Sequence, residues 1–254
     1  EGAAGELLLA LLAALADVST DPRPEVRNSG LRTLVSTLVS HGGRLEAQQW
    51  QVALWDHLFP LVAEMRRLAA GASQDEHVGR ELGRSKGQAV RMLVHHSRNT
   101  SEKQWDETLV LALSGLARLI KSHLPALGTL PGFAEGWAAV LDFTECSILH
   151  GNKEVALAAS AALALVLHAH AGSEALPPGV WESAVALYVR VGVEAVKPDT
   201  SMPLQVRQDL VLSHGELYKT RGAAFSDADA LAMVRTLDAF ARNPRALSDP
   251  GGAG

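Results

Sequence analysis

The amino-acid sequence predicts an all-α fold, a solenoid of antiparallel helix pairs, and three observations lead to this class. Alanine and leucine together occupy 79 of the 254 positions, whereas valine and isoleucine occupy only 24, and small and straight-chain apolar residues favour helix over strand. Apolar residues recur every three or four positions through most of the chain. Breaks rich in proline and glycine separate these apolar stripes.

The composition also excludes several classes of protein. An apolar content of 47% is enough for a sizeable core, so most of the chain is expected to fold. The single cysteine, Cys146, excludes a disulfide framework and a cysteine-based zinc site, which makes the cytosol the default compartment. The net charge of -5 argues against nucleic-acid binding. The apolar stretch Leu7 to Val18 is too short to cross a bilayer and lacks the basic flank of a signal peptide.

The first half of the chain is predicted to begin with helices at 6–18 and 23–41, which Asp21-Pro22 separates and Gly42-Gly43 ends. A third helix is predicted at 46–69 because its apolar residues fall on one face at the helical period. These residues are Trp50, Leu54, Leu58, Leu61, Val62 and Met65.

A helix at 103–123 is predicted to pair with the helix at 46–69. Its stripe consists of Trp105, Leu109, Ala112, Leu113, Leu116 and Ile120. Ser101 and Gln104 have the spacing of a capping box at its start. The segment Pro125 to Gly132 holds two prolines and two glycines and is predicted to be a loop.

The second half repeats the same pattern of stripe and break. Asn152 follows Gly151 and is predicted to be an N-cap. The predicted helix pairs are 133–149 with 153–170 and 179–196 with 203–221, followed by a last helix at 226–242.

A recurring valine just inside a helix indicates an internal repeat. Val26, Val155 and Val206 each follow a short turn, and the gap of 51 residues between the last two is close to the 40–47 residues of a HEAT or armadillo repeat. An arginine directly follows two of these valines, Val26 and Val206. Arg27 and Arg207 are expected to bind carboxylates of adjacent turns, or else to be ordinary surface arginines.

These features predict one HEAT/armadillo-like α-solenoid segment over 1–242, with about four helix pairs and a terminal helix. An irregular insertion is expected at 71–101 because glycines interrupt the stripe there, and a disordered tail is expected at 243–254. Because the chain begins at Glu1 without a methionine, we expect it to be a fragment of a larger protein.

Two segments carry a resemblance to a known family. The segment from Asp21 to Ser29 looks like the region after the exchange domain in the large Arf guanine-nucleotide exchange factors. The segment LVHHSRNTSEKQWDETLVL, from Leu93 to Leu111, resembles the Mon-two family, the giant HEAT-repeat proteins of Golgi and endosome traffic. The resemblance covers about residues 17 to 197. It implies a family that is related to the exchange factors but lacks their catalytic domain.

The function that this resemblance implies is that of a non-enzymatic scaffold or adaptor in endosome-to-Golgi transport. Its family would be cytoplasmic and peripheral at trans-Golgi network and endosome membranes. Its partners would be a Dopey-type protein and Arf-like small GTPases. A regulatory HEAT segment of a large Arf exchange factor is the alternative within the same class.

The different-class alternative is a hydrolase with a site near His95 and His96. These adjacent histidines would diverge on a helix, so they do not predict a metal site. The sequence shows no phosphate-binding loop, and no catalytic residue, cofactor or metal is predicted.

The insertion is locally basic in an acidic chain and is the candidate contact with an acidic partner or anionic membrane. The alternative is that its charges only solvate a short helix. Trp55 lies one position off its stripe and is a candidate exposed contact. The candidate contact residues are Arg80, Arg84, Lys86, Arg91, His95, His96, Arg98, Lys103 and Trp55.

Overall fold

A computed structural model describes residues 2–78, 80–85, 88–92, 100–170, 177, 179–197, 199–221 and 225–242. Short 3-10 (Gly42–Arg44) and π-helical (Val52–Leu58) segments accompany ten α-helices and two strands in this part of the chain. The α-helices and strands are α1 (Gly2–Val18), α2 (Pro24–His41), α3 (Ala47–Gln51), α4 (Phe59–Val78), β1 (Arg80–Ser85), β2 (Gln88–Met92), α5 (Ser101–Leu127), α6 (Phe133–His150), α7 (Lys153–Ala169), α8 (Val180–Ala195), α9 (Leu204–Arg221) and α10 (Asp227–Arg242).

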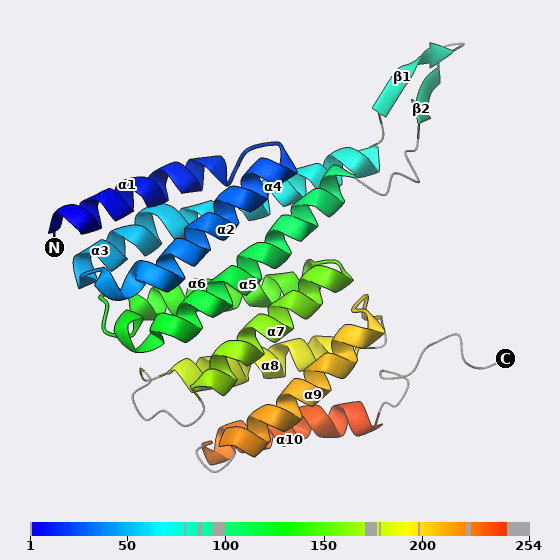
Figure 1. Cartoon of the computed structure of the whole chain (residues 1–254). Coiled ribbons are helices and arrows are strands. Elements are labelled where there is room, and N and C mark those ends of the chain that lie inside the picture. The colour runs from blue at the N-terminus through cyan, green and yellow to red at the C-terminus, as the bar shows by residue number, and fades with distance from the viewer. Residues whose placement is uncertain are drawn as a thin grey trace.

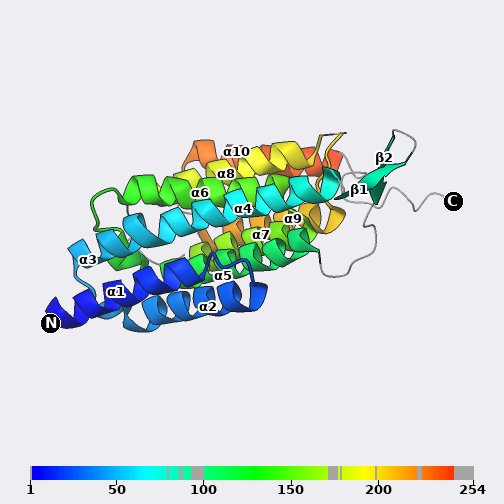
Figure 2. The same ribbon diagram turned by 90° about the horizontal axis from the view of Figure 1, so that it is seen from above.

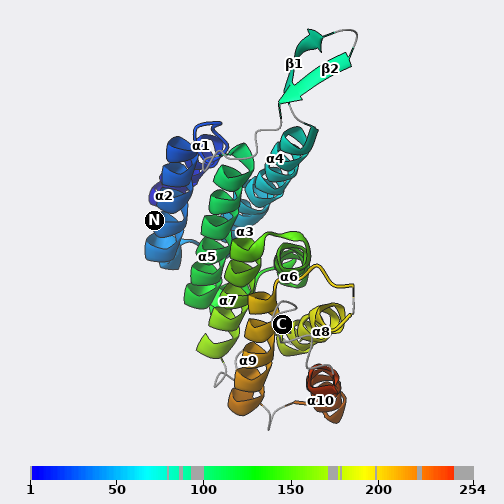
Figure 3. The same ribbon diagram turned by 90° about the vertical axis from the view of Figure 1, so that its right-hand side faces the viewer.

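The helices form two layers that are stacked along one direction (Figures 1 and 3). In one layer α2 contacts α5, α5 contacts α7, and α7 contacts α9. In the other layer α6 contacts α8 and α8 contacts α10, and α4 packs on α5 across the layers. Each pair covers the apolar face of the next, which is the arrangement of a solenoid. The predicted fold class, an all-α solenoid, is confirmed.

The helices run nearly parallel or antiparallel to one another, as the view from above shows (Figure 2). The N-terminus of α1 and the end of α4 therefore lie at opposite ends of the helix rods. Residues far apart in the sequence meet side by side where the helices of one layer contact one another.

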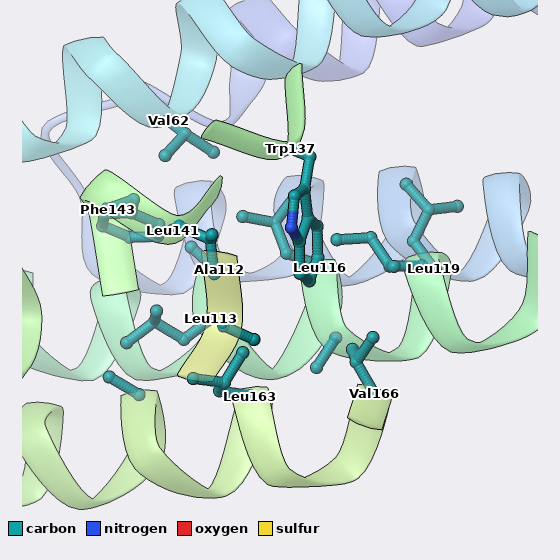
Figure 4. Packing of buried hydrophobic residues seen from close by; sticks show 14 of the residues in the cluster. Val62, Ala112, Leu113, Leu116, Leu119, Trp137, Leu141, Phe143, Leu163 and Val166 are labelled. Atoms are coloured by element: carbon teal, nitrogen blue, oxygen red, sulfur yellow. The ribbon is translucent and has the colours of Figure 1, made fainter. Parts of the chain in front are cut away.

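The core runs through the stack without interruption, and α5 is its central helix. Figure 4 shows Trp137 of α6 and Leu163 of α7 reaching toward Leu116 and Leu113 of α5 from opposite sides. Trp137 is 6% exposed, and its indole nitrogen donates a hydrogen bond to Ser183 Oγ at 2.9 Å. The stripe residues at 50, 54, 58, 61, 62 and 65 are all buried, as their spacing predicts.

Among the described helices, α5 is long and apolar enough to cross a membrane by length and composition alone. Its packing against α2, α4 and α7 explains this composition, because each of three neighbours covers one of its faces.

Trp55 is half-buried rather than exposed, because the helix widens to a π-helix at Val52–Leu58. Hydrogen bonds from i to i+5 make each turn wider, which brings an additional side chain onto the packed side. The Trp55 ring lies edge-on to Phe59 with 5.3 Å between ring centroids, and both rings pack beside Gly136 of α6. The expectation of an exposed contact at Trp55 is therefore corrected.

The loop predicted from Pro125 begins only after Leu127, because α5 continues through the proline. A proline has no N–H, so the carbonyl of Lys121, four residues earlier, loses its helical donor. His170 Nε2 lies 3.1 Å from this oxygen and, since a carbonyl only accepts, donates to it. The residue that follows the end of α7 thus supplies the donor that the proline removes.

The insertion also differs from the irregular segment that was expected. Helix α4 continues to Val78, and β1 pairs antiparallel with β2 to form a hairpin. The hairpin projects beyond the end of α4, outside the helical stack (Figure 1). Residues 72–78 contain neither proline nor glycine, so nothing in that segment ends the helix before Gly79. The tail expected at 243–254 lies outside the described residues.

A buried histidine lies between α8 and α9. His214 has no exposed surface, and its ring lies edge-on to Tyr188 with 4.9 Å between centroids. Its Nδ1 donates to Leu210 O at 2.8 Å, and its buried Nε2 has no partner within the described part of the chain. Burial lowers the pKa of His214 below its usual value of 6.5, because a charged ring would be desolvated.

This histidine is expected to make the protein less stable in acid. Below about pH 6.5 the unfolded chain binds a proton that the folded chain does not, so the free energy of unfolding falls by up to about 1.4 kcal/mol per pH unit until the folded-state pKa is reached. Urea titrations between pH 8 and 5 measure this slope. In the His214→Phe variant, which keeps a ring against Tyr188, the slope is expected to flatten. Equal slopes in both proteins contradict the assignment.

Candidate functional site

The N-terminal end of α5 is where the most distinctive sequence segment enters the stack. Thr100, not Ser101, is the N-cap, and its hydroxyl accepts from the Lys103 backbone N–H at 3.3 Å. The predicted cap is therefore shifted by one residue. This placement turns Trp105 inward, where it is 7% exposed, and leaves Lys103 on the surface.

Trp105 forms one wall of a buried polar cluster between α2 and α5. The guanidinium carbon of Arg27 lies 4.1 Å from the centroid of the Trp105 ring. Arg27 Nε donates to Thr108 Oγ1 at 2.9 Å, and Nη1 donates to Pro22 O at 2.8 Å. The Thr108 hydroxyl also lies 2.7 Å from Asn28 Oδ1. We call Arg27, Asn28, Trp105 and Thr108 the arginine cluster.

Arg27 is 1% exposed, so it is not a surface arginine. Its contacts are a hydroxyl, a carbonyl and an aromatic ring rather than the carboxylate that was expected. Burial lowers the pKa of the guanidinium, and the charges of Glu25, Asp21 and Glu107 act in the opposite direction. A guanidinium stacks on an aromatic face more readily than an ammonium, which explains why arginine suits this position. In Arg207, the other arginine of the pattern, Nε is buried without a partner among the described residues.

Further polar contacts connect the helices of the same layer. Asn152 Oδ1 accepts from the Val155 N–H at 2.9 Å, which confirms the predicted cap of α7, and Asn152 Nδ2 donates to Asp106 Oδ2 at 2.6 Å. One residue thus caps α7 and ties it to α5. Ser160 of α7 donates to Asp209 of α9. These contacts fix the positions of α5, α7 and α9 along the layer.

A groove of about 520 Å³ lies over this layer, beside the arginine cluster. It crosses α2, α5 and α7, and half-buried Val110 and Leu111 contribute apolar surface to it. Its polar rim carries two cations and three carboxylates. The lining residues are Asn28, Arg32, Lys103, Asp106, Glu107, Val110, Leu111, Asn152 and Glu154. We call this the layer groove.

The layer groove has the features of a binding surface for a polypeptide. An apolar strip with charges of both signs at its rim suits a segment with its own apolar side chains and charges. Within the described residues, no group of three or more histidine, cysteine, aspartate or glutamate side chains could hold a metal ion.

The structure brings only one of the sequence-predicted contact residues to this groove, namely Lys103. Arg80 and Arg84 lie on β1, and Arg91 lies on β2, where its backbone is opposite that of Glu81 in the strand register. Trp55 packs on α6, as described above. Lys86, His95, His96 and Arg98 lie outside the described residues.

Sequence reasoning missed most of the layer groove, because its residues come from three helices that are far apart in the chain. A signal existed for some of them. Arg32 and Asn28 lie one turn apart on α2, and both are absent from the apolar stripe of that helix. The sequence also contained an indication of the hairpin. Only two residues, Lys86 and Gly87, separate its strands, and this spacing is typical of tight hairpins.

Comparison with known proteins identifies a family for this chain. Residues 3–230 match the family described as the C-terminal region of Mon2 protein. The chain is 32% identical over 215 residues to the Mon2 homolog of Drosophila melanogaster, covering 80% of this chain and 12% of that protein. It is 39% identical over 153 residues to the Mon2 homolog of Homo sapiens, covering 60% of this chain and 8% of that protein. No solved structure matches the chain significantly.

A weaker similarity extends to an exchange factor. Over 66 residues the chain is 35% identical to brefeldin A-inhibited guanine nucleotide-exchange protein 2 of Arabidopsis thaliana. The match covers 26% of this chain and 4% of that protein.

The stacked helix pairs and the layer groove define a scaffold-type α-solenoid, a class that works by presenting a surface. The family match, which spans most of the chain, specifies this class further. The chain belongs to the Mon2 family and corresponds to its C-terminal region. It spans about a tenth of the length of the two Mon2 homologs named above.

Proposed function

We propose that this chain is a non-enzymatic scaffold segment of a membrane-trafficking protein and that it binds a protein partner in the layer groove. The observation that carries the proposal is the rigid construction of this groove. It crosses three helices, of which α2 and α5 are joined by the arginine cluster and α5 and α7 by Asp106 and Asn152. A preorganised surface loses little entropy on binding, which favours affinity.

The charges of the layer groove provide the test of this proposal. Arg32 and Lys103 are exposed cations on α2 and α5. In the full-length protein, Arg32→Glu combined with Lys103→Glu is expected to weaken capture of at least one partner by tenfold or more, because close pairing with rim carboxylates of the partner turns into repulsion. Affinity capture with quantitative mass spectrometry measures the change.

The matched control is Arg118→Glu, which reverses an exposed charge on α5 outside the layer groove. It is expected to leave the captured proteins unchanged. Circular dichroism melting of each variant checks that folding is retained. The proposal is overturned if the double variant folds and captures the same proteins in the same amounts as the unsubstituted protein.

The specific setting of this function is also a proposal. We place the protein at the cytoplasmic face of trans-Golgi network and endosome membranes, in endosome-to-Golgi transport. A Dopey-type protein and an Arf-like small GTPase are the proposed partners. The names of the relatives support a trafficking scaffold in general terms, and the capture experiment above identifies the partners directly.

The projecting hairpin favours a second contact, with anionic membrane. Arg80, Arg84 and Arg91 lie on strands that extend away from the stack, so a membrane could reach them without meeting the helices (Figure 1). Vesicles that contain phosphatidylserine are expected to sediment the protein, and charge reversal at Arg80, Arg84 and Lys86 is expected to weaken the affinity about a hundredfold or more, since each basic residue near such a surface contributes about 1 kcal/mol. Binding that is absent or insensitive to salt rejects this contact.

A regulatory segment of a large Arf exchange factor is the other candidate, and the similarity to the Arabidopsis thaliana protein favours it. Nucleotide exchange on an Arf protein, assayed with the full-length chain, decides between the two. Stimulated exchange supports the regulatory segment, and no stimulation supports the scaffold.

A further inference from the structure

Helix α1, the first helix of the stack, is apolar on nearly all sides, but its neighbours in the structure cover only one of them. Helix α1 contains only two charged residues, Glu6 and Asp17, in its 17 positions. At the other end of the stack, α10 contains five charged residues in 16 positions. A helix that is apolar all round is normally buried all round. The N-terminal end of this stack therefore differs from the C-terminal end.

The inner face of α1 is buried against neighbouring elements. Leu12 is 1% exposed, and α1 packs on α2 and on the α3 and π-helical segments. The outer face is open: Leu7 is 73% exposed, Leu11 46% and Val18 42%. Ala10 and Ala14 are exposed between them. Together these five residues follow the spacing i, i+3, i+4, i+7 and i+11, which is one continuous stripe on a helix. We call it the outer stripe.

The outer stripe has the composition of a helix-packing seam elsewhere in this protein. In α7, which lies between α5 and α9, the buried residues Val155, Ala159, Leu163 and Val166 combine larger apolar side chains with alanine in the same way. Alanines between larger side chains form grooves that accept the ridge of another helix.

The neighbouring helix indicates that the missing element is a single helix. The side of α2 that faces away from α5 is polar, with exposed Ser29, Thr33, Ser36 and Ser40. Of the two described helices at this end of the stack, α1 thus presents an uncovered apolar face and α2 does not. Terminal elements of solenoids require a polar outer face, and α1 does not have one.

The relatives show which part of the chain could supply that helix. This chain matches the C-terminal region of its family, and the matched part is 12% of the Drosophila melanogaster relative and 8% of the human one. In such proteins a long N-terminal part precedes this region. We propose that a helix from the N-terminal part of the same longer chain packs lengthwise on the outer stripe and continues the layer of α1. This inference does not depend on the partner proposed for the layer groove.

A photo-crosslinking amino acid placed at position 11 of the full-length protein tests the proposal. Irradiation is expected to give an intramolecular crosslink to a residue that precedes this region, identified by peptide mass spectrometry. The same amino acid at position 212 is the control, because Leu212 of α9 is 68% exposed, and no crosslink to the preceding part is expected there. A crosslink between two copies, a crosslink to lipid, or no crosslink at position 11 overturns the proposal.

A second measurement uses charge. Leu7→Glu combined with Leu11→Glu is expected to raise the rate of proteolytic cleavage just before α1 in the full-length protein by tenfold or more, because the packed helix is released. Leu212→Glu, at a more exposed leucine, is expected to leave this rate unchanged. The melting temperature of the helices after α1 is expected to stay the same, since both leucines point to the outside. An unchanged cleavage rate in the double variant contradicts the proposal.

Discussion

Replacing Trp105 by alanine is expected to lower the free energy of unfolding by about 3–5 kcal/mol, which is the usual cost of truncating a buried tryptophan. The ring is 7% exposed and lies 4.1 Å from the guanidinium carbon of Arg27. Its removal therefore opens a cavity between α2 and α5 and also withdraws the aromatic face from a buried cation. Urea unfolding monitored by circular dichroism measures the loss.

Two variants separate the aromatic contact from general effects of substitution. Trp105→Phe keeps an aromatic face over Arg27 and is expected to lose less than half as much as the alanine variant. Leu212→Ala, at a side chain that is 68% exposed, is expected to change the free energy of unfolding by less than about 0.5 kcal/mol. If Trp105→Ala is as mild as Leu212→Ala, the arginine cluster does not hold α2 on α5.

The second large effect is expected at Gly192, where α8 crosses α10. A Cβ at this position would stand 2.3 Å from Thr236 Cγ2, a distance that real structures do not tolerate. The Thr236 hydroxyl donates to Ala232 O at 3.0 Å, so either this side chain gives up the hydrogen bond and turns away or the helices move apart. Gly192→Ala is expected to lower the free energy of unfolding by about 1–3 kcal/mol, although alanine is the better helix former.

Gly215 of α9 provides a matched control, since no described atom outside its own stretch of helix lies within 4 Å of where its Cβ would stand. Gly215→Ala is expected to raise the free energy of unfolding by about 0.5–1 kcal/mol, because alanine restricts the unfolded chain and favours helix. The same substitution thus has opposite signs at two helical glycines. Equal signs would mean that α10 does not pack on α8 as described.

The sequence was most informative about the helices. The apolar period predicted most of the helix ends to within a few residues, and the proline and glycine breaks predicted the turns between the helices. Asn152 was identified as a cap because a side-chain acceptor beside a glycine break has few other roles. These features are local, so a single chain segment contains enough information to predict them.

Features that depend on a distant segment were not predictable. Pro125 remains in a helix because His170 supplies a donor to the carbonyl that the proline leaves unpaired. The inward position of Trp55 requires the π-helical widening and the space beside Gly136 of α6. In each case a tertiary contact overrides a local preference.

The candidate site shows the same limit. Lys103 was found because it was counted among the basic residues of the insertion, whereas Arg32 and Glu154 acquire a role only when α2 and α7 meet α5. Arg27 was predicted either to bind carboxylates of adjacent turns or to be an ordinary surface arginine, and neither alternative names its partners, since only the packed structure places Trp105 and Thr108 against it.

Hydrogen–deuterium exchange of the Trp105→Ala and Gly192→Ala variants is the most direct test of the stacked architecture. In a solenoid each helix pair is stabilised by its neighbours, so a defect acts mainly nearby. Trp105→Ala is expected to reduce amide protection in α1 and α2 first and to spare α8 to α10, and Gly192→Ala is expected to do the reverse. A uniform loss of protection along the chain in both variants would contradict a stack of helix pairs and indicate one indivisible globular core.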